Sequence, residues 1–302
     1  MAIPPNRVVK EVYGKRGTTH SAFIAPSPSM AACVRGYVTR NTLEADLELD
    51  ERRNQFPPTP TCVITWVIRG HDTRIDMSVC TNTNHPKLPI VFSGPHTQPS
   101  VSDNPGPVHT FSVLIYPDAI RALTGLDISL HLDQYSQFCD VFDGHWQQMA
   151  HLVLEATNDE ERLRLIENFL APRWRAVQPT ELTSPSQFQD WSHGIARRAA
   201  DKNRGLGDRQ VDRRIKSWTG QALRQLRGIG RAEESLFQAR KRIDANDLKW
   251  SEVAAKSGYS DQAHMCREFR RITGLSPKDF RKMITHESYW LYQVWSQIPL
   301  DD

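Results

Sequence analysis

The spacing of apolar residues changes near residue 116, and this change limits the folds that the chain can adopt. Before it, short segments rich in Val, Ile, Thr and aromatic residues are separated by Pro, Asn, Asp and Gly, which is typical of strands. The segment Leu43–Leu49 alternates apolar and acidic residues, as a half-buried strand does. Several strands at short spacing favour an antiparallel barrel or sandwich. The predicted strands are Ala31–Thr39, Leu43–Leu49, Cys62–Ile68, Arg74–Val79 and Val108–Ile115.

Beyond residue 116 the apolar residues recur at helical spacing. Pro117 predicts the start of a short helix that Gly125 ends. Two longer helices are predicted at His145–Glu155 and Asp159–Leu170, with Asp159 as the N-cap of the second and Pro172 as its end.

A stretch with three prolines among polar residues, from Pro172 to Pro185, predicts a linker. Everything after it has a helical pattern. The predicted fold class is therefore α+β, with a β-rich N-terminal domain and following helices at residues 1–171. A linker at residues 172–186 and an all-α domain at residues 187–302 complete the predicted organisation.

The net charge of +3 hides an asymmetry between the two halves. Residues 1–180 contain 16 Lys and Arg against 19 Asp and Glu, whereas residues 191–282 contain 22 against 11. A basic domain beside an acidic one indicates a polyanionic partner for the basic half. Charge by itself does not distinguish DNA from RNA or from a lipid surface.

Composition favours a globular protein with a real core, since 39% of the residues are hydrophobic and 24% are charged. No apolar run approaches the roughly 20 residues of a membrane helix, and the first residues lack the apolar segment of a secretory signal. We therefore expect a cytosolic protein without a membrane partner. The five scattered cysteines have no Cys-x-x-Cys spacing, which argues against a disulfide framework or a zinc cluster.

The segment Ser251–Gly274 has the pattern of two helices joined by a tight turn. Ser251 is a candidate cap of the first helix, and Gly258 suits the turn because it adopts positive φ at little cost. In the second helix Met265, Phe269 and Ile272 share one face, and the opposite face is polar and basic. This arrangement is typical of a helix-turn-helix unit with its recognition helix.

A weaker copy of the pattern precedes it. Val211, Ile215 and Trp218 repeat the apolar spacing, and Gly220 takes the place of Gly274. The leading helix of this first unit is predicted at about Trp191–Asn203 and looks short. The two units span about residues 191–220 and 250–274.

The second unit resembles the C-terminal signature of the AraC/XylS family of bacterial transcription regulators. The residues that carry the resemblance are Gly258-Tyr259-Ser260-Asp261-Gln262-Ala263-His264, Arg267-Glu268-Phe269-Arg270-Arg271, Gly274-Leu275-Ser276-Pro277 and Phe280-Arg281. The resemblance covers about residues 187–284. A looser one links the segment from Ser93 to Pro117 to an uncharacterised N-terminal domain of one branch of the family, for which it implies a cupin-like or β-sandwich fold.

The family's arrangement implies a long helix between the two units, here about Gln221–Arg242. About 22 residues at ~1.5 Å each give roughly 33 Å, close to the ~34 Å turn of B-DNA. Such a helix can hold both recognition helices in successive major-groove segments. Gly228 and Gly230 inside it predict a bend or a close neighbouring helix.

The outward faces of the two recognition helices supply the candidate base contacts. Arg267 suits guanine and Gln262 suits adenine, and the alternative for Arg267 is a solvated or phosphate-bound side chain. Asp212 is unusual near phosphates, so we expect it either to accept from cytosine or to form a salt bridge with a neighbouring arginine. The full set is Arg209, Asp212, Arg213, Gln262, His264, Cys266 and Arg267.

Six further cations are assigned to phosphates, which set affinity and not sequence preference, or else to a solvated helix face. They are Lys216, Arg270, Arg271, Lys278, Arg281 and Lys282. The implied partner is double-stranded promoter DNA. RNA polymerase, a small-molecule or protein effector at the N-terminal domain, and a second copy of the chain are the other candidate partners.

Two other functions stay open at this stage. One is a cupin-type metalloenzyme with an accessory DNA-binding domain, and the other is a non-specific architectural DNA binder. No cofactor, metal site or catalytic residue is expected, because no hydrolase, nucleotide-binding or metalloprotease motif occurs and the N-terminal histidines lack ligand spacing. Those histidines are His71, His85, His96 and His109.

Overall fold

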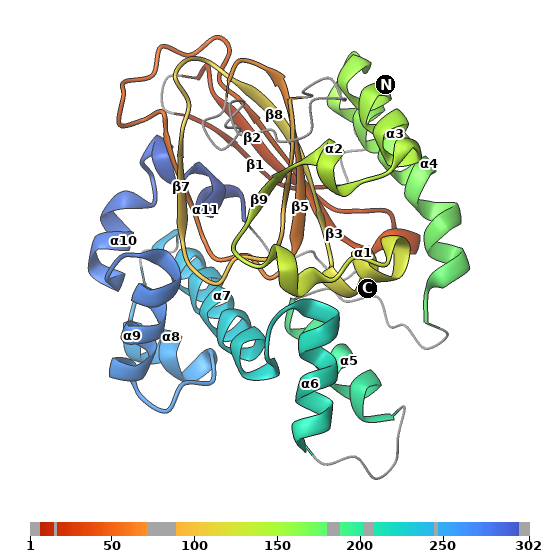
Figure 1. Cartoon of the computed structure of the whole chain (residues 1–302). Coiled ribbons are helices and arrows are strands. Elements are labelled where there is room, and N and C mark those ends of the chain that lie inside the picture. Colours follow the sequence, from red (N-terminus) through yellow and green to blue (C-terminus); the bar gives the residue numbers. More distant parts are fainter. Residues whose placement is uncertain are drawn as a thin grey trace.

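A seven-stranded antiparallel sheet forms the centre of the N-terminal half (Figure 1). The computed structural model describes residues 7–14, 17–71, 89–179, 188–201, 208–244 and 247–295. The sheet has the order β1-β2-β3-β8-β5-β6-β9, and a separate ribbon pairs β4 with β7. The strands are β1 Val8–Tyr13, β2 His20–Ile24, β3 Val34–Asn41, β4 Arg53–Phe56, β5 Cys62–Arg69, β6 Ile90–Ser93, β7 Ser100–Asp103, β8 His109–Ile115 and β9 Tyr135–Gln137.

Both faces of the sheet are buried. Tyr37, Trp66 and Phe111 belong to one apolar cluster together with residues of α3 (Gly144–Glu155) and α4 (Asp159–Val177). Val38 and Leu114 point to the opposite side, where they join a second cluster with the C-terminal helices. Because successive side chains of a strand alternate in direction, strands such as β3 and β8 contribute to both clusters. Helices α3 and α4 therefore cover one face of the sheet, and the short helix α11 (Trp290–Val294) contacts strands on the other side (Figure 1).

The predicted strand at Leu43–Leu49 is wrong, although its alternation is real. Ala45 and Leu47 are buried while Glu44, Asp46 and Glu48 are exposed. The segment pairs with no strand in the described residues and leads as a loop from β3 to β4. Burial of alternate side chains needs an extended backbone but not a ladder partner. The predicted strand Arg74–Val79 falls outside the described residues.

Helix α1 (Pro117–Thr124) ends at Gly125 with φ 78°, as predicted, but α4 differs from the prediction at both ends. Its N-cap is Asn158, which accepts a hydrogen bond from the backbone N–H of Glu161 at 2.9 Å. The helix then continues through Pro172 to Val177. Trp174 is 2% exposed and packs in the core, and this burial offsets the hydrogen bond that Pro172 cannot donate. The stretch after Leu170 is thus helical where a linker was predicted.

The C-terminal part is helical, as predicted. Its helices are α5 Phe188–Asp201, α6 Asp208–Thr219, α7 Leu223–Asp244, α8 Trp250–Lys256, α9 Gln262–Thr273 and α10 Pro277–Met283. A 3-10 turn at Glu287–Tyr289 and the short α11, Trp290–Val294, follow. No helix in the described ranges is long and apolar enough to cross a membrane.

The first helical unit is fixed to the N-terminal half through Asp118 of α1. Its carboxylate accepts a hydrogen bond from Trp191 Nε1 at 2.9 Å and forms an ion pair with Arg198, both on α5. Trp191 also stacks on Tyr116, with ring centroids 5.0 Å apart. Gly220 lies so close to Ile128 that an added Cβ would stand 3.3 Å from its carbonyl oxygen, and its φ of 75° also favours glycine.

The apolar core does not divide where the predicted domain boundary falls. Trp191, Ile215 and Ile229 belong to the same cluster as the sheet residues Tyr37 and Trp66. Residues 1–171 and 187–302 therefore share buried surface. The division at residues 172–186 stays a prediction from the sequence pattern. Residues 180–186 of this stretch lie outside the described residues.

We expect Asp118→Ala to lower the free energy of unfolding by about 3 kcal/mol, because it leaves a largely buried Arg198 without its carboxylate partner. Urea denaturation followed by tryptophan fluorescence measures the change. Asp103→Ala is the matched control, since its pair with Arg53 is more than half exposed and should contribute little. Equal losses in the two variants would contradict the role assigned to Asp118.

Candidate nucleic-acid interface

The second helix-turn-helix unit comprises α8, a turn at Gly258 and α9. Gly258 has φ 72°, and Asp261 caps α9 by accepting a hydrogen bond from the backbone N–H of His264 at 2.7 Å. That bond and one from Ser260 lower the pKa of Asp261, so the cap is a carboxylate near neutral pH. Helix α8 begins one residue before Ser251, and the predicted cap at Ser251 is therefore wrong. Met265 and Phe269 are fully buried beneath the unit.

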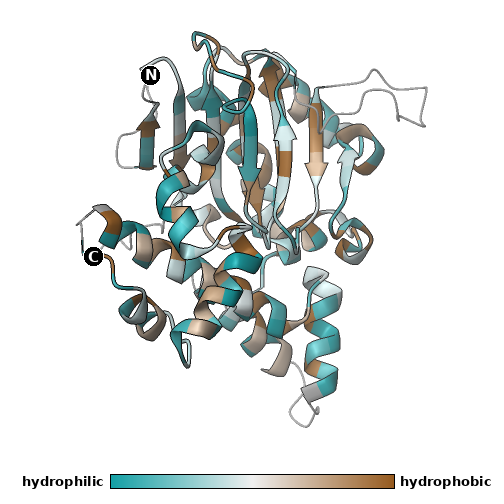
Figure 2. Cartoon of the chain, turned by 90° about the vertical axis from the view of Figure 1, so that its left-hand side faces the viewer, coloured by the Kyte–Doolittle hydropathy of each residue, from teal (hydrophilic) through white to brown (hydrophobic). Residues whose placement is uncertain are grey.

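The outward face of α9 is polar and basic. Gln262 and Arg267 are both exposed, as a contact with base edges requires. Figure 2 shows hydrophilic and hydrophobic residues mixed along the helices in this part of the molecule. Both side chains thus remain candidates for base contacts.

Two other predicted base contacts on α9 are less open. His264 is half-buried, with its ring 5.3 Å from that of Tyr259 and its Nδ1 3.4 Å from Ser260 Oγ. Burial raises the pKa of Tyr259 to about 12, so this neighbour of His264 is an uncharged phenol. Cys266 is also half-buried and packs against the second apolar cluster.

In the first unit α6 exposes Arg209 and Arg213. Asp212 has a contact that neither of its predicted roles includes. Its Oδ1 accepts a hydrogen bond from the backbone N–H of Leu223 at 3.0 Å, at the first residue of α7. The carboxylate thus stabilises the N-terminus of the helix that joins the two units.

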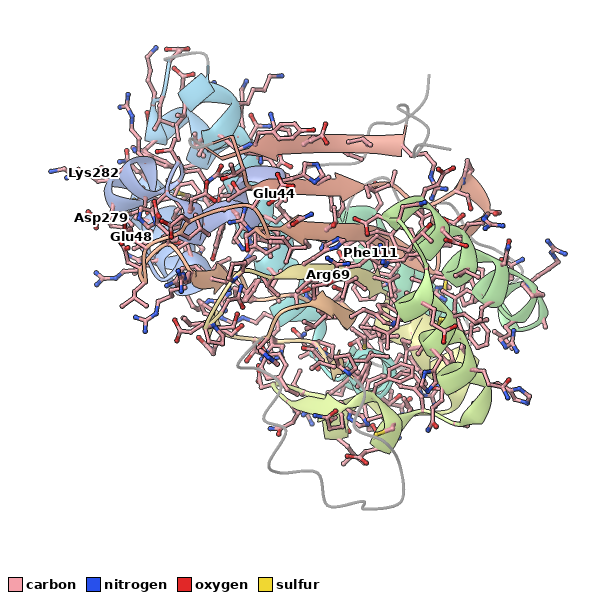
Figure 3. All side chains as sticks on the ribbon, turned by 90° about the horizontal axis from the view of Figure 1, so that it is seen from above. Glu44, Glu48, Arg69, Phe111, Asp279 and Lys282 are labelled. Atoms are coloured by element: carbon pink, nitrogen blue, oxygen red, sulfur yellow. The ribbon has the colours of Figure 1, made fainter. Side chains whose placement is uncertain are left out.

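All six cations assigned to phosphates are exposed. Arg271 forms an ion pair with Glu268 on the same helix, at 3.0 Å. Lys282 projects from α10 at the periphery of the molecule, far from Phe111 in the core (Figure 3). The set is Lys216, Arg270, Arg271, Lys278, Arg281 and Lys282.

Three arginines on α7 were not predicted as DNA contacts from the sequence. Arg224, Arg227 and Arg231 line a groove with Asp212 and Val211 of α6. The signal was present in their spacing of three and four residues, which places them on one face of a helix. Arg231 also lies over the ring of Tyr259, 5.8 Å from its centroid, and so contacts both units. These cations extend the basic surface between the two recognition helices.

Helix α7 joins the two units. Its 22 residues span Leu223–Asp244, or about 33 Å at ~1.5 Å per residue. At Gly228 an added Cβ would lie 3.4 Å from the Arg271 guanidinium of α9. This glycine therefore allows α7 and the second recognition helix to approach closely, which was one of the two predicted reasons for it.

The N-terminal histidines have separate partners. His96 Nε2 lies 2.9 Å from Ser93 Oγ, and His109 Nε2 lies 3.3 Å from the Asp159 carboxylate. His71 is exposed, and His85 lies outside the described residues. Within the described ranges no three His, Cys, Asp or Glu side chains gather as metal ligands would.

Comparison with known families identifies the helical unit. Residues 202–283 match the model of a helix-turn-helix domain. The C-terminal part of the chain is an AraC-type helix-turn-helix domain. The match covers α6 to α10, including both predicted recognition helices of the AraC-type domain.

Residues 22–137 match a domain of unknown function, DUF6597, which confirms the predicted uncharacterised domain ahead of the AraC-type domain. Among curated proteins none matches the chain. Solved structures that resemble it include ToxT from Vibrio cholerae, at 13% identity and TM-score 0.34, over 76% of this chain and 94% of that one. Another is unsaturated fatty acid bound ToxT, at 10% identity and TM-score 0.33, over 77% and 94% of the two chains.

We expect Arg267→Ala to weaken specific DNA binding by about 1–3 kcal/mol and to relax the preference at one base pair, because it removes a donor pair from the open face of α9. Arg281→Ala is the matched control, since loss of a phosphate contact weakens binding to specific and random DNA alike. Fluorescence anisotropy on both DNAs at one salt concentration gives the comparison. Equal losses of affinity on the two DNAs for Arg267→Ala would indicate that Arg267 contacts a phosphate and not a base.

Proposed function

We propose that the protein is a sequence-specific DNA-binding transcription regulator of the AraC type, which contacts successive major-groove segments on one face of the duplex. The observation that carries this proposal is the pair of exposed basic helix faces, on α6 and α9, joined by a helix about as long as one turn of DNA. The arginines of α7 between them add positive charge where the DNA backbone would cross.

The two units should contribute unequally to sequence preference. In the second unit the recognition helix has a side-chain cap, a buried apolar face and two exposed side chains suited to bases. In the first unit Asp212 is already bonded to the start of α7, which leaves Arg209 and Arg213 to face the groove. A well-supported helix holds its side chains in register with base edges, so the second unit is expected to dominate.

We also propose that the N-terminal half controls this presentation in response to an effector or protein partner. Its sheet shares buried surface with α5, α6 and α7, so a change in the sheet has a direct route to the DNA-binding helices. RNA polymerase and a second copy of the chain are further candidate partners.

Footprinting of two double variants on a mapped promoter tests the proposal. The wild type should protect two major-groove segments about one helical turn apart. Gln262→Ala with Arg267→Ala should remove protection at one segment and cost more specificity than Arg209→Ala with Arg213→Ala, which should affect the other segment. A larger loss of base discrimination in the first-unit variant would refute the ranking. Protection of a single segment in the wild type would refute the two-unit proposal itself.

A further inference from the structure

A cavity of about 80 Å³ lies on the face of the sheet opposite α3 and α4. Strands β3, β5, β6 and β8 form its floor, and the ribbon of β4 and β7 forms one side. Part of the remaining wall comes from a segment that follows α10, where Trp290, Leu291 and Trp295 line the cavity. A segment that follows the DNA-binding helices therefore closes a cavity in the N-terminal domain. We call residues Glu287–Trp295 the C-terminal segment.

The lining combines apolar surface with neutral hydrogen-bonding groups. Val38, Val63 and Leu114 supply apolar contacts from the sheet. Two hydroxyl pairs lie among the polar groups: Thr65 Oγ1 lies 2.9 Å from Ser112 Oγ, and Ser100 Oγ lies 3.0 Å from the Tyr135 hydroxyl. A hydroxyl offers one donor and two acceptor positions, so each pair retains capacity for a further bond.

Charge restricts what this cavity accepts. Among the described residues that line it there is no Asp, Glu, Lys or Arg. Its histidine, His96, is buried, and the ring nitrogens lie 2.9 Å from Ser93 Oγ and 3.8 Å from the Asp133 carboxylate, so His96 already has its own partners. A buried ion without a counter-ion is strongly unfavourable, whereas a neutral molecule with a hydroxyl group can use the paired hydroxyls. The lining therefore favours an uncharged, partly apolar ligand over an anion or cation of the same shape.

The C-terminal segment is bonded to α7, the helix between the two DNA-binding units. Trp295 Nε1 donates to Glu233 of α7, which also pairs with Arg35 of β3. From α7, Arg240 Nη1 donates to the backbone carbonyls of Tyr292, Gln293 and Trp295, at 3.1, 2.8 and 2.6 Å. These carbonyls belong to the end of a short helix, where intrahelical donors are missing.

The same segment is bonded to the sheet domain. Trp290 Nε1 donates to Asn54 Oδ1 of β4 at 2.8 Å, and Arg40 of β3 forms an ion pair with Glu287 at 2.8 Å. Trp295 packs on Phe23 of β2, with ring centroids 5.5 Å apart. Displacement of the segment would therefore loosen contacts to the sheet and to α7 together.

Size makes such a displacement necessary for most ligands. An engineered apolar cavity of about 150 Å³ binds benzene, and this one is about half as large. The floor is a hydrogen-bonded sheet, whereas the C-terminal segment is a 3-10 turn and one short helix. The segment is held by the side-chain contacts described above and not by a strand ladder, so it is the wall that we expect to move.

We propose that this cavity binds a small uncharged molecule with a ring-sized apolar body and a hydroxyl group, and that its entry displaces the C-terminal segment and loosens α7 from the sheet. The link to DNA rests on the proposed function, but the ligand site and the displacement do not. By thermodynamic reciprocity, a promoter fragment would change the affinity for the ligand by the same factor that the ligand changes the affinity for the promoter.

Two probes of matched shape test the ligand class on the full chain. Isothermal titration calorimetry should show binding of 4-methylphenol, which is uncharged at pH 7. It should show binding of 4-methylbenzoate at least about tenfold weaker, since that probe carries an unpaired charge into the cavity. Equal affinities, or preference for the benzoate, would overturn the assignment.

Two variants of opposite effect on volume locate the site. Leu291→Ala enlarges the cavity and should tighten 4-methylphenol binding several-fold, whereas Ser112→Leu fills it and should abolish binding. Leu152→Ala on α3, 52% exposed, is the control and should leave binding unchanged. Thermal melts of each variant verify folding, and the opposite signs separate a cavity effect from general destabilisation. Unchanged binding in both cavity variants would overturn the site.

Hydrogen exchange detected by mass spectrometry tests the displacement. With 4-methylphenol bound, exchange should increase in residues 287–295 and in the α7 stretch around Glu233 and Arg240, while α3 stays unchanged. Binding without such an increase would overturn the displacement. None of these measurements contains DNA, so they decide the inference even if the footprinting experiment refutes the proposed function, and the converse also holds.

Discussion

The buried ion pair between Arg35 of β3 and Glu233 of α7 joins the N-terminal sheet to the DNA-binding helices. Their side chains are 6% and 11% exposed. Either charge, buried without the other, would be strongly destabilising. Glu233 also accepts from Trp295, and Arg35 lies over the ring of that tryptophan, 4.5 Å from its centroid. Sheet, linking helix and C-terminal segment thus meet at one carboxylate. Because α7 carries both helix-turn-helix units, their position relative to the sheet depends on this contact.

Local sequence patterns predicted the elements that local physics determines. Strand-like composition and spacing predicted the strands around Tyr37, Trp66 and Phe111. The turns at Gly125 and Gly258 were predictable because glycine adopts positive φ at little cost. Sequence patterns were insufficient where tertiary packing determines the secondary structure. Leu43–Leu49 has the alternation of a strand but finds no partner in the described residues, and α4 passes Pro172 because the core buries Trp174.

The candidate interface divides in the same way. The exposed positions of Gln262 and Arg267 follow from helical periodicity, so the sequence was sufficient to predict them. The bond of Asp212 to the start of α7 depends on how α6 and α7 meet, which no spacing rule specifies. The C-terminal segment was hardest to predict, because its place against β2, β3 and β4 joins residues more than 200 positions apart. Its one sequence signal was the density of aromatic residues at Tyr289, Trp290, Tyr292 and Trp295.

The central claim is that α7 holds two recognition helices at a fixed spacing of about one DNA turn. Affinity measured on promoter sites lengthened between the two half-sites tests it most directly. Insertion of about 5 base pairs rotates one half-site by half a turn away from its recognition helix. We predict that this insertion, and one of about 10 base pairs that restores the face but doubles the separation, both reduce binding to that of a single half-site. Equal affinity for the original and the lengthened sites would contradict the account.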